Sequence, residues 1–326
     1  MSVQQTLIIV KPDGMVKGLI KKILQALTEY DLRVVTHACT QLSREWVESI
    51  YNEERNEIYF TEVVDWVSSS PVLLLKVEGV EAVAKVKWKI IGRYPNGIRG
   101  QHSENWIKNV AHAPDSIQSA LRELELSRSI FEERKKMGEN RLNSKMIFAL
   151  TGMSECGKST VGKYLDSRGI KRLKIVKLFE RVHERLSPYE DFHEFLRHQE
   201  EYNPYALWDA FIEELLKEME KSDTNAASIE SLYGGGLGPY LKQELGRHFC
   251  LMFIDIPFEI RLCRQMQREN LSDLESARGF LLPRDEIKEK SGIPALKEIA
   301  DEVVDNSGTL EDLTCEIDSI IKKYSS

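Results

Sequence analysis

Short apolar runs and helical stripes alternate along the first 126 residues. The runs at 6–10, 33–38 and 71–77 have the length and composition of buried strands. Apolar residues between and after them recur at helical spacing: Leu19, Ile20, Ile23, Leu24 and Leu27 form one such face, and further helical patterns lie near 43–52, near 59–69 and from about residue 80. This order of strands and helices predicts a ferredoxin-like α+β sandwich.

The second half of the chain has a different pattern. Apolar runs at 146–151, 226–230 and 249–255 alternate with helical segments, and a strand and turn at 300–310 precede an amphipathic last helix. Strands that alternate with helices predict a parallel sheet flanked by helices, an α/β fold.

Residues 127–144 separate these two patterns. They are dense in charge, poor in large apolar residues, and end in turn-forming residues just before the run at 146. A chain of 326 residues is also longer than one hydrophobic core usually organises. The sequence therefore predicts a domain at 1–126, a charged linker containing a short helix at 127–144, and a second domain at 145–326.

A glycine-rich loop follows the run at 146–151 and precedes a helical segment at 159–168. Its residues are Gly152, Met153, Ser154, Glu155, Cys156, Gly157, Lys158, Ser159 and Thr160. In this strand–loop–helix context the glycines let backbone N–H groups surround phosphates, at a helix N-terminus that favours anions. Lys158 can reach the β- and γ-phosphates of ATP, and the Ser159 hydroxyl can bind Mg²⁺. The loop predicts a Walker A site for a nucleoside triphosphate.

Three motifs in the first half occur in a recognisable order. Lys11-Pro-Asp-Gly14 ends the first strand, Ile98-Arg-Gly100 follows later, and Asn109-Val-Ala-His112-Ala-Pro-Asp-Ser116 comes last. Together they resemble the nucleoside diphosphate kinase family over about residues 4–126. That resemblance implies transfer of a γ-phosphoryl group between two nucleotides through a histidine, and His112 falls on that position. Imidazole suits a nucleophile because it is largely neutral at pH 7.

The same resemblance assigns roles to the residues around His112. Glu123 matches the carboxylate that orients the histidine ring, and Tyr51 matches a tyrosine beside it. Tyr59 matches the aromatic residue that stacks on the base. The residues that match phosphate and ribose contacts are Lys11, Lys87, Arg99 and Asn109.

Four features depart from the family pattern. Lys87 stands where the family has an arginine. A guanidinium group that can bind two oxygens at once is therefore replaced by a single ammonium group. Tyr94 stands near an expected threonine, Pro114 replaces a serine, and the segment 92–98 is shorter than the family's long loop. Two hypotheses follow from them. The first half is a working phosphotransferase, or it is a nucleotide-binding module that regulates the other half or its assembly.

Arginines in the second half suggest a small-molecule kinase. Arg261, Arg264 and Arg268 lie on one face of a predicted helix, where they can neutralise phosphates, although a solvated helix face is the alternative. Residues 145–324 resemble the nucleoside monophosphate kinases, with a likeness to dephospho-coenzyme A kinases at 305–312. That resemblance places Asn306 near the adenine of ATP. The acceptor stays open; Glu230 is a candidate for orienting it or Mg²⁺, against a plain strand-end role.

Composition narrows the function classes. Net charge is −7 without a basic block, which argues against nucleic-acid binding. The five cysteines are scattered without CxxC spacing, as in reduced cytosolic proteins. Neither a signal peptide nor an apolar stretch of about 20 residues is present, so we expect no membrane contact and a cytoplasmic location.

We therefore expect two phosphotransferases in one chain, with Mg²⁺ and ATP as cofactors. The second half would phosphorylate a nucleoside monophosphate or a similar acceptor, and the first would convert the diphosphate to a triphosphate. Homo-oligomer formation is expected from the resemblance of the first half.

Overall fold

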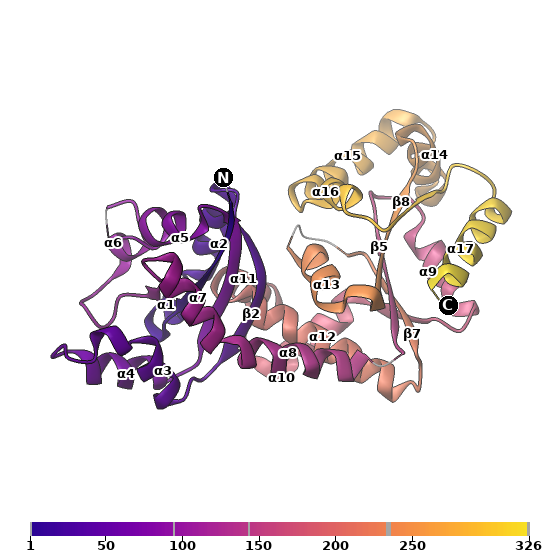
Figure 1. The fold of residues 1–326 in the computed structure, drawn as a ribbon. Helices are drawn as coiled ribbons and strands as arrows, with labels where there is room; N and C mark the ends of the chain where they lie inside the picture. The colour runs from indigo at the N-terminus through magenta and orange to yellow at the C-terminus, as the bar shows by residue number, and fades with distance from the viewer. Residues whose placement is uncertain (1, 94, 143, 233–235, 325–326) are drawn as a thin grey trace. The chain divides into compact units, whose positions relative to one another are not determined.

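The computed structural model describes residues 2–93, 95–142, 144–232 and 236–324. By its contacts the chain divides into two compact units (Figure 1). The first comprises Met1–Met137 together with Glu190–Leu207, and the second comprises Gly138–Tyr189 together with Trp208–Ser326. The segment predicted as a linker is mostly one helix, α8 (Arg128–Leu142).

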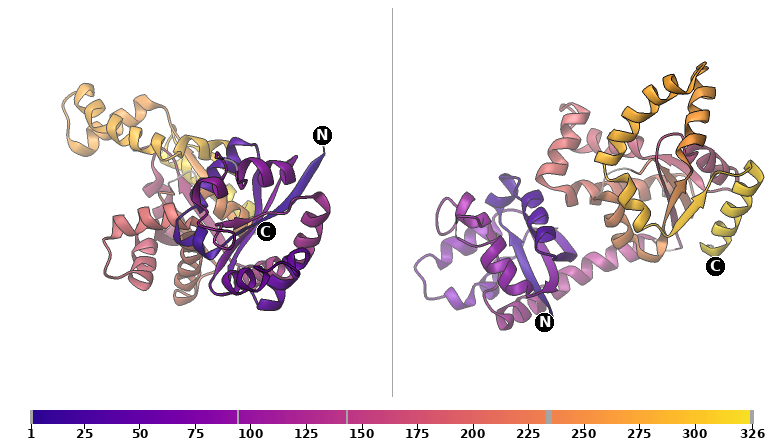
Figure 2. Two further views of the ribbon diagram at one scale, coloured as in Figure 1. Left: turned by 90° about the vertical axis from the view of Figure 1, so that its left-hand side faces the viewer. Right: turned by 90° about the horizontal axis from the view of Figure 1, so that it is seen from above.

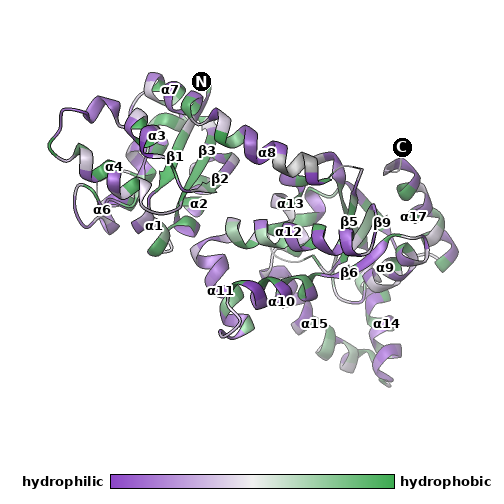
Figure 3. Cartoon of the chain, turned by 90° about the horizontal axis from the view of Figure 1, so that it is seen from below, coloured by the Kyte–Doolittle hydropathy of each residue, from purple (hydrophilic) through white to green (hydrophobic). Residues whose placement is uncertain are grey.

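The first unit contains an antiparallel sheet in the order β2-β3-β1-β4. Its strands are β1 (Val3–Val10), β2 (Arg33–Thr40), β3 (Val72–Val80) and β4 (Ala111–His112). β1 pairs with β3 from Val3↔Val80 to Val10↔Leu73. The two strands are largely apolar in Figure 3, which agrees with their burial between helices. The predicted antiparallel α+β fold is confirmed.

The helices within residues 1–126 follow the predicted order. They are α1 (Pro12–Val16), α2 (Ile20–Glu29), α3 (Arg44–Ile50), α4 (Phe60–Ser68), α5 (Ala82–Ala84), α6 (Ile98–His102) and α7 (Ile117–Leu126), with a 3-10 turn η1 (Asn52–Glu54) and a π-helical segment η2 (Lys85–Ile90). The helix expected from about residue 80 begins at Ala82, because β3 continues to Val80 and Glu81 turns the chain with a positive φ of 57°.

The second unit contains a five-stranded sheet in the order β6-β7-β5-β8-β9, and every strand pair in it is parallel. Its strands are β5 (Met146–Thr151), β6 (Lys171–Lys174), β7 (Ala226–Glu230), β8 (Phe249–Asp255) and β9 (Glu302–Asp305). The predicted parallel α/β fold is confirmed. β6 was not predicted, because its sequence Lys-Arg-Leu-Lys contains one apolar residue and gives no strand signal.

Helices cover both faces of this sheet. They are α9 (Lys158–Ser167), α10 (Ile175–Leu186), α12 (Pro204–Lys221), α13 (Leu237–Leu245), α14 (Phe258–Glu269), α15 (Leu274–Lys290), α16 (Ile293–Glu298) and α17 (Leu310–Tyr324), with a 3-10 turn η3 (Gly246–His248). In Figure 1, α9 and α17 lie on one side of the sheet and α13 on the other. α14 and α15 pack together, and Figure 2 shows this pair (light orange) projecting beyond the sheet.

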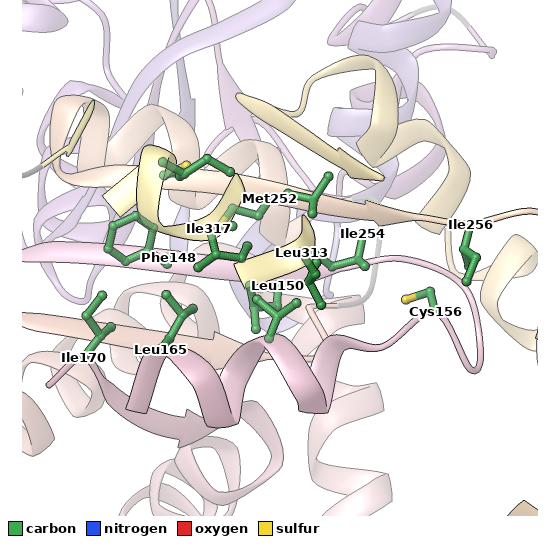
Figure 4. Close-up of a cluster of buried hydrophobic side chains, with 14 residues drawn as sticks. Phe148, Leu150, Cys156, Leu165, Ile170, Met252, Ile254, Ile256, Leu313 and Ile317 are labelled. Carbon is green, nitrogen blue, oxygen red and sulfur yellow. The ribbon is translucent and has the colours of Figure 1, made fainter. Parts of the chain in front are cut away.

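The core of the second unit lies between β5, β8, α9 and α17 (Figure 4). Phe148 and Leu150 of β5 pack with Leu165 of α9 and Ile317 of α17. Cys156, on the loop after β5, belongs to the same cluster and is buried. A hydrophobic anchor therefore holds the glycine-rich loop against the core.

Helix α11 (Phe192–Tyr202) comes from the second half of the sequence but packs against α2 in the first unit. Tyr202 lies over Gly18, where a Cβ atom would be 2.6 Å from the ring carbon Cδ1. Tyr205, just after α11, stacks on the buried His37 of β2 with ring centroids 4.1 Å apart. Tyr202, Tyr205 and His37 therefore contribute to packing within the first unit.

A glycine substitution tests this docking of α11. Gly18 has a φ of +64°, so alanine there is strained by the backbone and also meets the Tyr202 ring. We expect Gly18→Ala to lower the free energy of unfolding by about 1–3 kcal/mol in urea titrations. Gly169→Ala is the matched control, because Gly169 also has a positive φ of 83° but nothing within 4 Å of its Cβ position. If the two substitutions lowered the free energy of unfolding equally, the packing of Tyr202 on Gly18 would be contradicted.

Candidate functional site

His112 lies at the end of the short strand β4, inside the first unit. Its Nε2 is 2.8 Å from Oε2 of Glu123 on α7, and the two side chains are 8% and 2% exposed. Tyr51 meets the imidazole edge-on, with ring centroids 5.1 Å apart. Burial fixes the imidazole between a carboxylate and an aromatic ring, so its orientation is set by the protein.

The backbone before His112 is strained, and the Lys11–Gly14 motif supports it. Val110 has a φ of 64°, which is rare for a β-branched residue and costs about 1–3 kcal/mol. Its N–H donates to Oδ2 of Asp13 (2.8 Å), and its carbonyl accepts from the N–H of Lys11 (2.9 Å). Gly14 leaves room for that carbonyl, since a Cβ atom there would be 2.2 Å away. The motif therefore positions the strand that carries His112.

Three cationic side chains surround this histidine. Lys11 is 1% exposed, and its Nζ lies 5.4 Å from the centroid of the Tyr51 ring. Arg99 donates from Nε to the carbonyl of Ala111 (2.7 Å), and Lys87 donates to the carbonyl of Ala113 (2.8 Å). The two acceptor carbonyls belong to the residues on either side of His112. The cations are thus gathered around the imidazole, as an anionic substrate requires.

Burial changes the acidity of several of these groups. Burial and the charge of Arg99 lower the pKa of Lys11 to about 7. Burial, together with Arg99, also lowers the pKa of Lys87, and burial lowers the pKa of Arg99. Burial raises the pKa of Tyr51, so its hydroxyl stays protonated. For Lys11 and Lys87, burial therefore outweighs the nearby carboxylates, among them Glu54, which raise the pKa of both lysines.

Two polar atoms in this site are buried without a hydrogen-bond partner among the described residues: the hydroxyl of Tyr51 and Oδ1 of Asn109. The amide nitrogen of Asn109 donates to the carbonyl of Trp106 (2.7 Å). Tyr59 directly precedes α4, and its partly buried side chain packs against the cluster that contains Tyr51. Unpaired buried polar atoms are costly, and a bound ligand would supply the missing partners.

The glycine-rich loop of the second unit lies at the carboxyl edge of the parallel sheet. Gly152 and Gly157 have φ values of 135° and 102°. A Cβ atom at Gly152 would be 2.4 Å from the carbonyl oxygen of Ile254, and one at Gly157 would be 2.1 Å from Nδ2 of Asn306. Only glycine fits at these two positions.

Lys158 folds back over this loop. Its Nζ donates to the carbonyls of Gly152 (2.9 Å) and Met153 (2.8 Å) and lies 3.3 Å from Sγ of Cys156. Asn306, buried after β9, donates to the carbonyl of Cys156 (2.7 Å). The lysine and the loop backbone together form the floor of a pocket of about 470 Å³. Its lining residues are Ser154, Glu155, Cys156, Gly157, Lys158, Ser159, Thr160, Arg264, Arg268, Arg284 and Lys288.

The three arginines predicted on α14 all face this loop, but in different ways. Arg264 donates to the carbonyl of Asn306 (2.9 Å), and Arg268 pairs with Glu155 (2.6 Å). Arg261 is buried, pairs with Asp285 and donates to the carbonyl of Ser154 (3.3 Å). Arg264 and Arg268 therefore line the pocket. Arg261 does not line it and instead contacts the backbone of the loop through the carbonyl of Ser154.

Helix α15 contributes residues that the sequence did not suggest. Lys288 donates to the carbonyl of Gly152 (3.3 Å), and burial together with the charge of Lys158 lowers its pKa to about 8. Arg284 lies 3.9 Å from Glu155, and Asp285 accepts from the N–H of Ser154 (3.2 Å). Their positions follow from the packing of α15 on α14, which no local sequence pattern reveals.

Glu230, the candidate for orienting an acceptor, ends β7. Both of its carboxylate oxygens bind Arg172 of β6, and the residue is 6% exposed. The structure therefore shows it in an ion pair between two strands. Residues 233–235 of the glycine segment that follows lie outside the described residues, as does Tyr94 in the first unit.

Comparison with known proteins identifies the first unit. Residues 4–135 match the family described as nucleoside diphosphate kinase. The nucleoside diphosphate kinase of Saccharolobus islandicus is 34% identical over 132 residues, which are 39% of this chain and 95% of that protein. Through this domain, the chain belongs to the nucleoside diphosphate kinase family.

Two further relatives carry the same description. The nucleoside diphosphate kinase of Archaeoglobus fulgidus is 36% identical over 129 residues, 38% of this chain and 85% of that protein. A solved structure of the Aquifex aeolicus nucleoside diphosphate kinase is 34% identical, covers 38% of this chain and 94% of its own, and has a TM-score of 0.36.

Within the nucleoside diphosphate kinase domain, the structure brings together most of the residues that the sequence singled out. Lys11, Tyr51, Lys87, Arg99 and Asn109 lie around the His112–Glu123 pair through the contacts given above. Tyr59 lies at the border of the neighbouring apolar cluster. Asp13 was missed. Asp13 stood in the quoted motif, but its contact with Val110 depends on tertiary structure.

Two negative findings concern the described part of the chain. None of its helices is long and apolar enough to cross a membrane. Nowhere in residues 2–93, 95–142, 144–232 and 236–324 do three His, Cys, Asp or Glu side chains gather as metal ligands.

The lowered pKa of Lys11 predicts proton uptake when a nucleotide binds to the nucleoside diphosphate kinase domain. Phosphates near Lys11 favour its charged form and raise its pKa from about 7, so near pH 8 binding takes up as much as about one proton. Calorimetry of ADP binding in buffers of different ionisation enthalpy measures this uptake. We expect a Lys158→Ala background to weaken any binding to the pocket of the second unit.

The control for this prediction is a pair of variants. Lys11→Met removes the titrating amine and should abolish the uptake. Lys85→Met should retain it, because Lys85 donates to the carbonyl of Tyr30 and belongs to no pocket described above. Uptake that is unchanged in Lys11→Met would contradict the assignment.

Proposed function

We propose that this chain combines two phosphotransferases. The first domain converts nucleoside diphosphates to triphosphates through a phosphorylated His112. The second domain transfers a phosphoryl group from ATP to a nucleoside monophosphate or a similar phosphorylated acceptor. The observation that carries the proposal is the buried His112–Glu123 pair, 2.8 Å apart and surrounded by Lys11, Arg99 and Lys87, within a domain of the matching family.

The hydrogen bond to Glu123 selects the attacking nitrogen. The carboxylate accepts from Nε2–H, which leaves the lone pair of the neutral imidazole on Nδ1. Nδ1 attacks the γ-phosphorus of ATP, the bond to the bridging oxygen breaks, and ADP leaves with that oxygen. A terminal oxygen of a second nucleoside diphosphate then attacks the same phosphorus and releases the imidazole as the N–P bond breaks.

Glu123 and the cations stabilise the charges that develop in these two steps. While the phosphoryl group is on Nδ1, the imidazole carries more positive charge, and the Glu123 carboxylate compensates for it. Lys11, Arg99 and Lys87 offset the charge on the equatorial oxygens of the phosphoryl group. The unpartnered hydroxyl of Tyr51 and Oδ1 of Asn109 offer hydrogen bonds to the phosphoryl group and the ribose.

In the second domain the glycine-rich loop, Lys158, Arg264 and Arg268 support a role in binding the triphosphate of ATP. An oxygen of the acceptor attacks the γ-phosphorus directly and ADP leaves, so no protein nucleophile is needed. Arg284 and Lys288 on α15 add further positive charge to the lining of the pocket. The Ser159 hydroxyl at the start of α9 would help to hold Mg²⁺, which would supply further positive charge to the triphosphate.

Covalent linkage of the two domains would speed the conversion of a monophosphate to a triphosphate. The diphosphate released by the second domain is a substrate of the first, and one chain holds both at a raised effective concentration. A dephospho-coenzyme A-type acceptor is the alternative for the second domain, supported by the likeness at 305–312 and by Asn306 behind the loop.

A panel of acceptors tests this proposal. Purified protein is incubated with ATP and, in turn, each nucleoside monophosphate, its deoxy form or dephospho-coenzyme A, and the nucleotides are separated and quantified. We expect one class of monophosphate to yield the triphosphate, with the diphosphate as an intermediate. ATP with any nucleoside diphosphate should also yield the triphosphate. If no diphosphate is converted, the first domain is not a phosphotransferase.

A further inference from the structure

A small pocket of positive charge lies beside Arg99 in the first domain. It has a volume of about 380 Å³ and is lined by Lys87, Trp88, Gly92, Arg93 and Arg99. Three of these five residues are cationic, and no carboxylate from the described residues lines it. Lys87 and Arg99 were singled out from the sequence, whereas nothing in the sequence pointed to Arg93.

The backbone holds Arg93 at this pocket. The N–H of Arg99 donates to the carbonyl of Ile91, and the N–H of Gly100 donates to that of Gly92, both at 3.1 Å. Gly97 packs so closely on Gly92 that a Cβ atom would be 2.2 Å from its carbonyl oxygen. The base of the short segment 92–98 is therefore closed, and Arg93 lies directly after the anchored Gly92.

The side chain of Arg93 stacks on an aromatic ring. Its guanidinium carbon is 3.8 Å from the centroid of the Trp106 ring, and the Trp106 side chain is 65% exposed. Stacking holds the planar guanidinium by its face and leaves its N–H groups, which lie in the plane, available for an anion. The guanidinium is thus oriented for phosphate oxygens, and no carboxylate among the described residues forms an ion pair that neutralises it.

The charge of Arg93 acts on the groups of the site. After burial and the larger effect of Arg99, Arg93 contributes to the lowered pKa of Lys11. It also opposes the rise in the pKa of Tyr59 that burial causes. Tyr59 is the residue expected to stack on the base, and Lys11 lies beside His112, where the phosphates are expected. The charge of Arg93 therefore acts on both the base end and the phosphate end of the proposed nucleotide site.

We propose that Arg93 is a phosphate-binding residue of the first domain, which supplies the guanidinium fork that Lys87 lacks. Lys87 presents one ammonium group, already bonded to the carbonyl of Ala113, whereas a guanidinium binds two phosphate oxygens at once. Arg93 and Arg99 together grip the diphosphate chain of a nucleoside di- or triphosphate. This inference rests on the proposed nucleotide site, and it names a residue that the motifs do not.

Binding measurements test the role of Arg93 separately from turnover. In the full chain with Lys158→Ala, calorimetry gives the dissociation constants of ADP and adenosine. Because a charge-assisted pair to phosphate is lost, we expect Arg93→Ala to weaken ADP binding by about tenfold or more. Adenosine affinity should not change. Arg93→Lys should recover part of the loss, and Arg33→Ala, at an arginine that pairs with Glu78 outside the pocket, should have no effect.

A second substitution tests the relation to Lys87. If Arg93 supplies the missing fork, Lys87→Arg should restore part of the ADP affinity lost in Arg93→Ala. ADP affinity in Arg93→Ala equal to that in Arg33→Ala would overturn the proposal, and so would an equal loss for ADP and adenosine. The proposed phosphotransfer fails on a different result, the absence of a phosphorylated His112 in the unmodified chain.

Discussion

Replacement of His112 by alanine is expected to abolish the conversion of nucleoside diphosphates to triphosphates. The variant lacks the atom that carries the phosphoryl group, and loss of a nucleophile lowers kcat by about 10⁴-fold or more. With ATP and the acceptor of the second domain as substrates, the diphosphate should accumulate in place of the triphosphate. Chromatography of the nucleotides over time measures both outcomes.

Two variants accompany His112→Ala. Glu123→Gln keeps the shape of the side chain but removes the negative charge that supports the imidazole, so a smaller loss of kcat is expected. His102→Ala is the matched control. That histidine lies in α6 and contacts Lys22 instead of the buried pair, and full activity is expected. Normal triphosphate formation by His112→Ala would contradict the two-step scheme.

Replacement of Lys158 by alanine is expected to remove the activity of the second domain. Lys158 is the cation nearest the loop carbonyls, and Gly152, Met153 and Cys156 hold it in place. Loss of one such preorganised charge lowers kcat by about 10²–10³-fold. Formation of the diphosphate from its monophosphate should fall by that factor, while conversion of an added diphosphate to the triphosphate continues.

Lys163→Ala is the control for this second prediction. Lys163 lies on the same helix, α9, but is exposed and outside the pocket lining. We expect it to leave both activities unchanged. An equal rate of diphosphate formation in Lys158→Ala and Lys163→Ala would show that the loop at 152–159 does not bind the reacting ATP.

The sequence predicted the two folds because each depends on local patterns. The runs in β1, β5 and β8 are continuous and apolar, and the stripe in α2 repeats at helical spacing. β6 escaped prediction because an edge strand needs little apolar content. The packing of α11 on α2 was not predicted, because the contact between Tyr202 and Gly18 joins segments that are far apart in the chain.

In the candidate sites, too, the residues that the sequence predicted belong to local patterns, and those that it missed depend on tertiary contacts. His112, Lys11 and Lys158 belong to short motifs whose residue types and spacing indicate their chemistry. Arg93 and Lys288 belong to no motif, and their positions depend on the closed base of segment 92–98 and on the packing of α15. Arg261 had the right spacing on α14, but its partner Asp285 comes from another helix. Spacing predicts which face a residue occupies, and tertiary contacts decide what it binds.

The most direct test of phosphoryl transfer through His112 is phosphorylation of the protein itself. The unmodified chain is incubated with ATP labelled in the γ-phosphoryl group, without a diphosphate acceptor, and the protein-bound label is measured. Transfer through His112 predicts a label that is stable to base, labile to acid and transferred to any added nucleoside diphosphate. The label should be retained in Lys158→Ala and absent from His112→Ala. An unmodified chain that binds ADP in its first domain but takes up no label, or a label that persists in His112→Ala, would contradict this transfer.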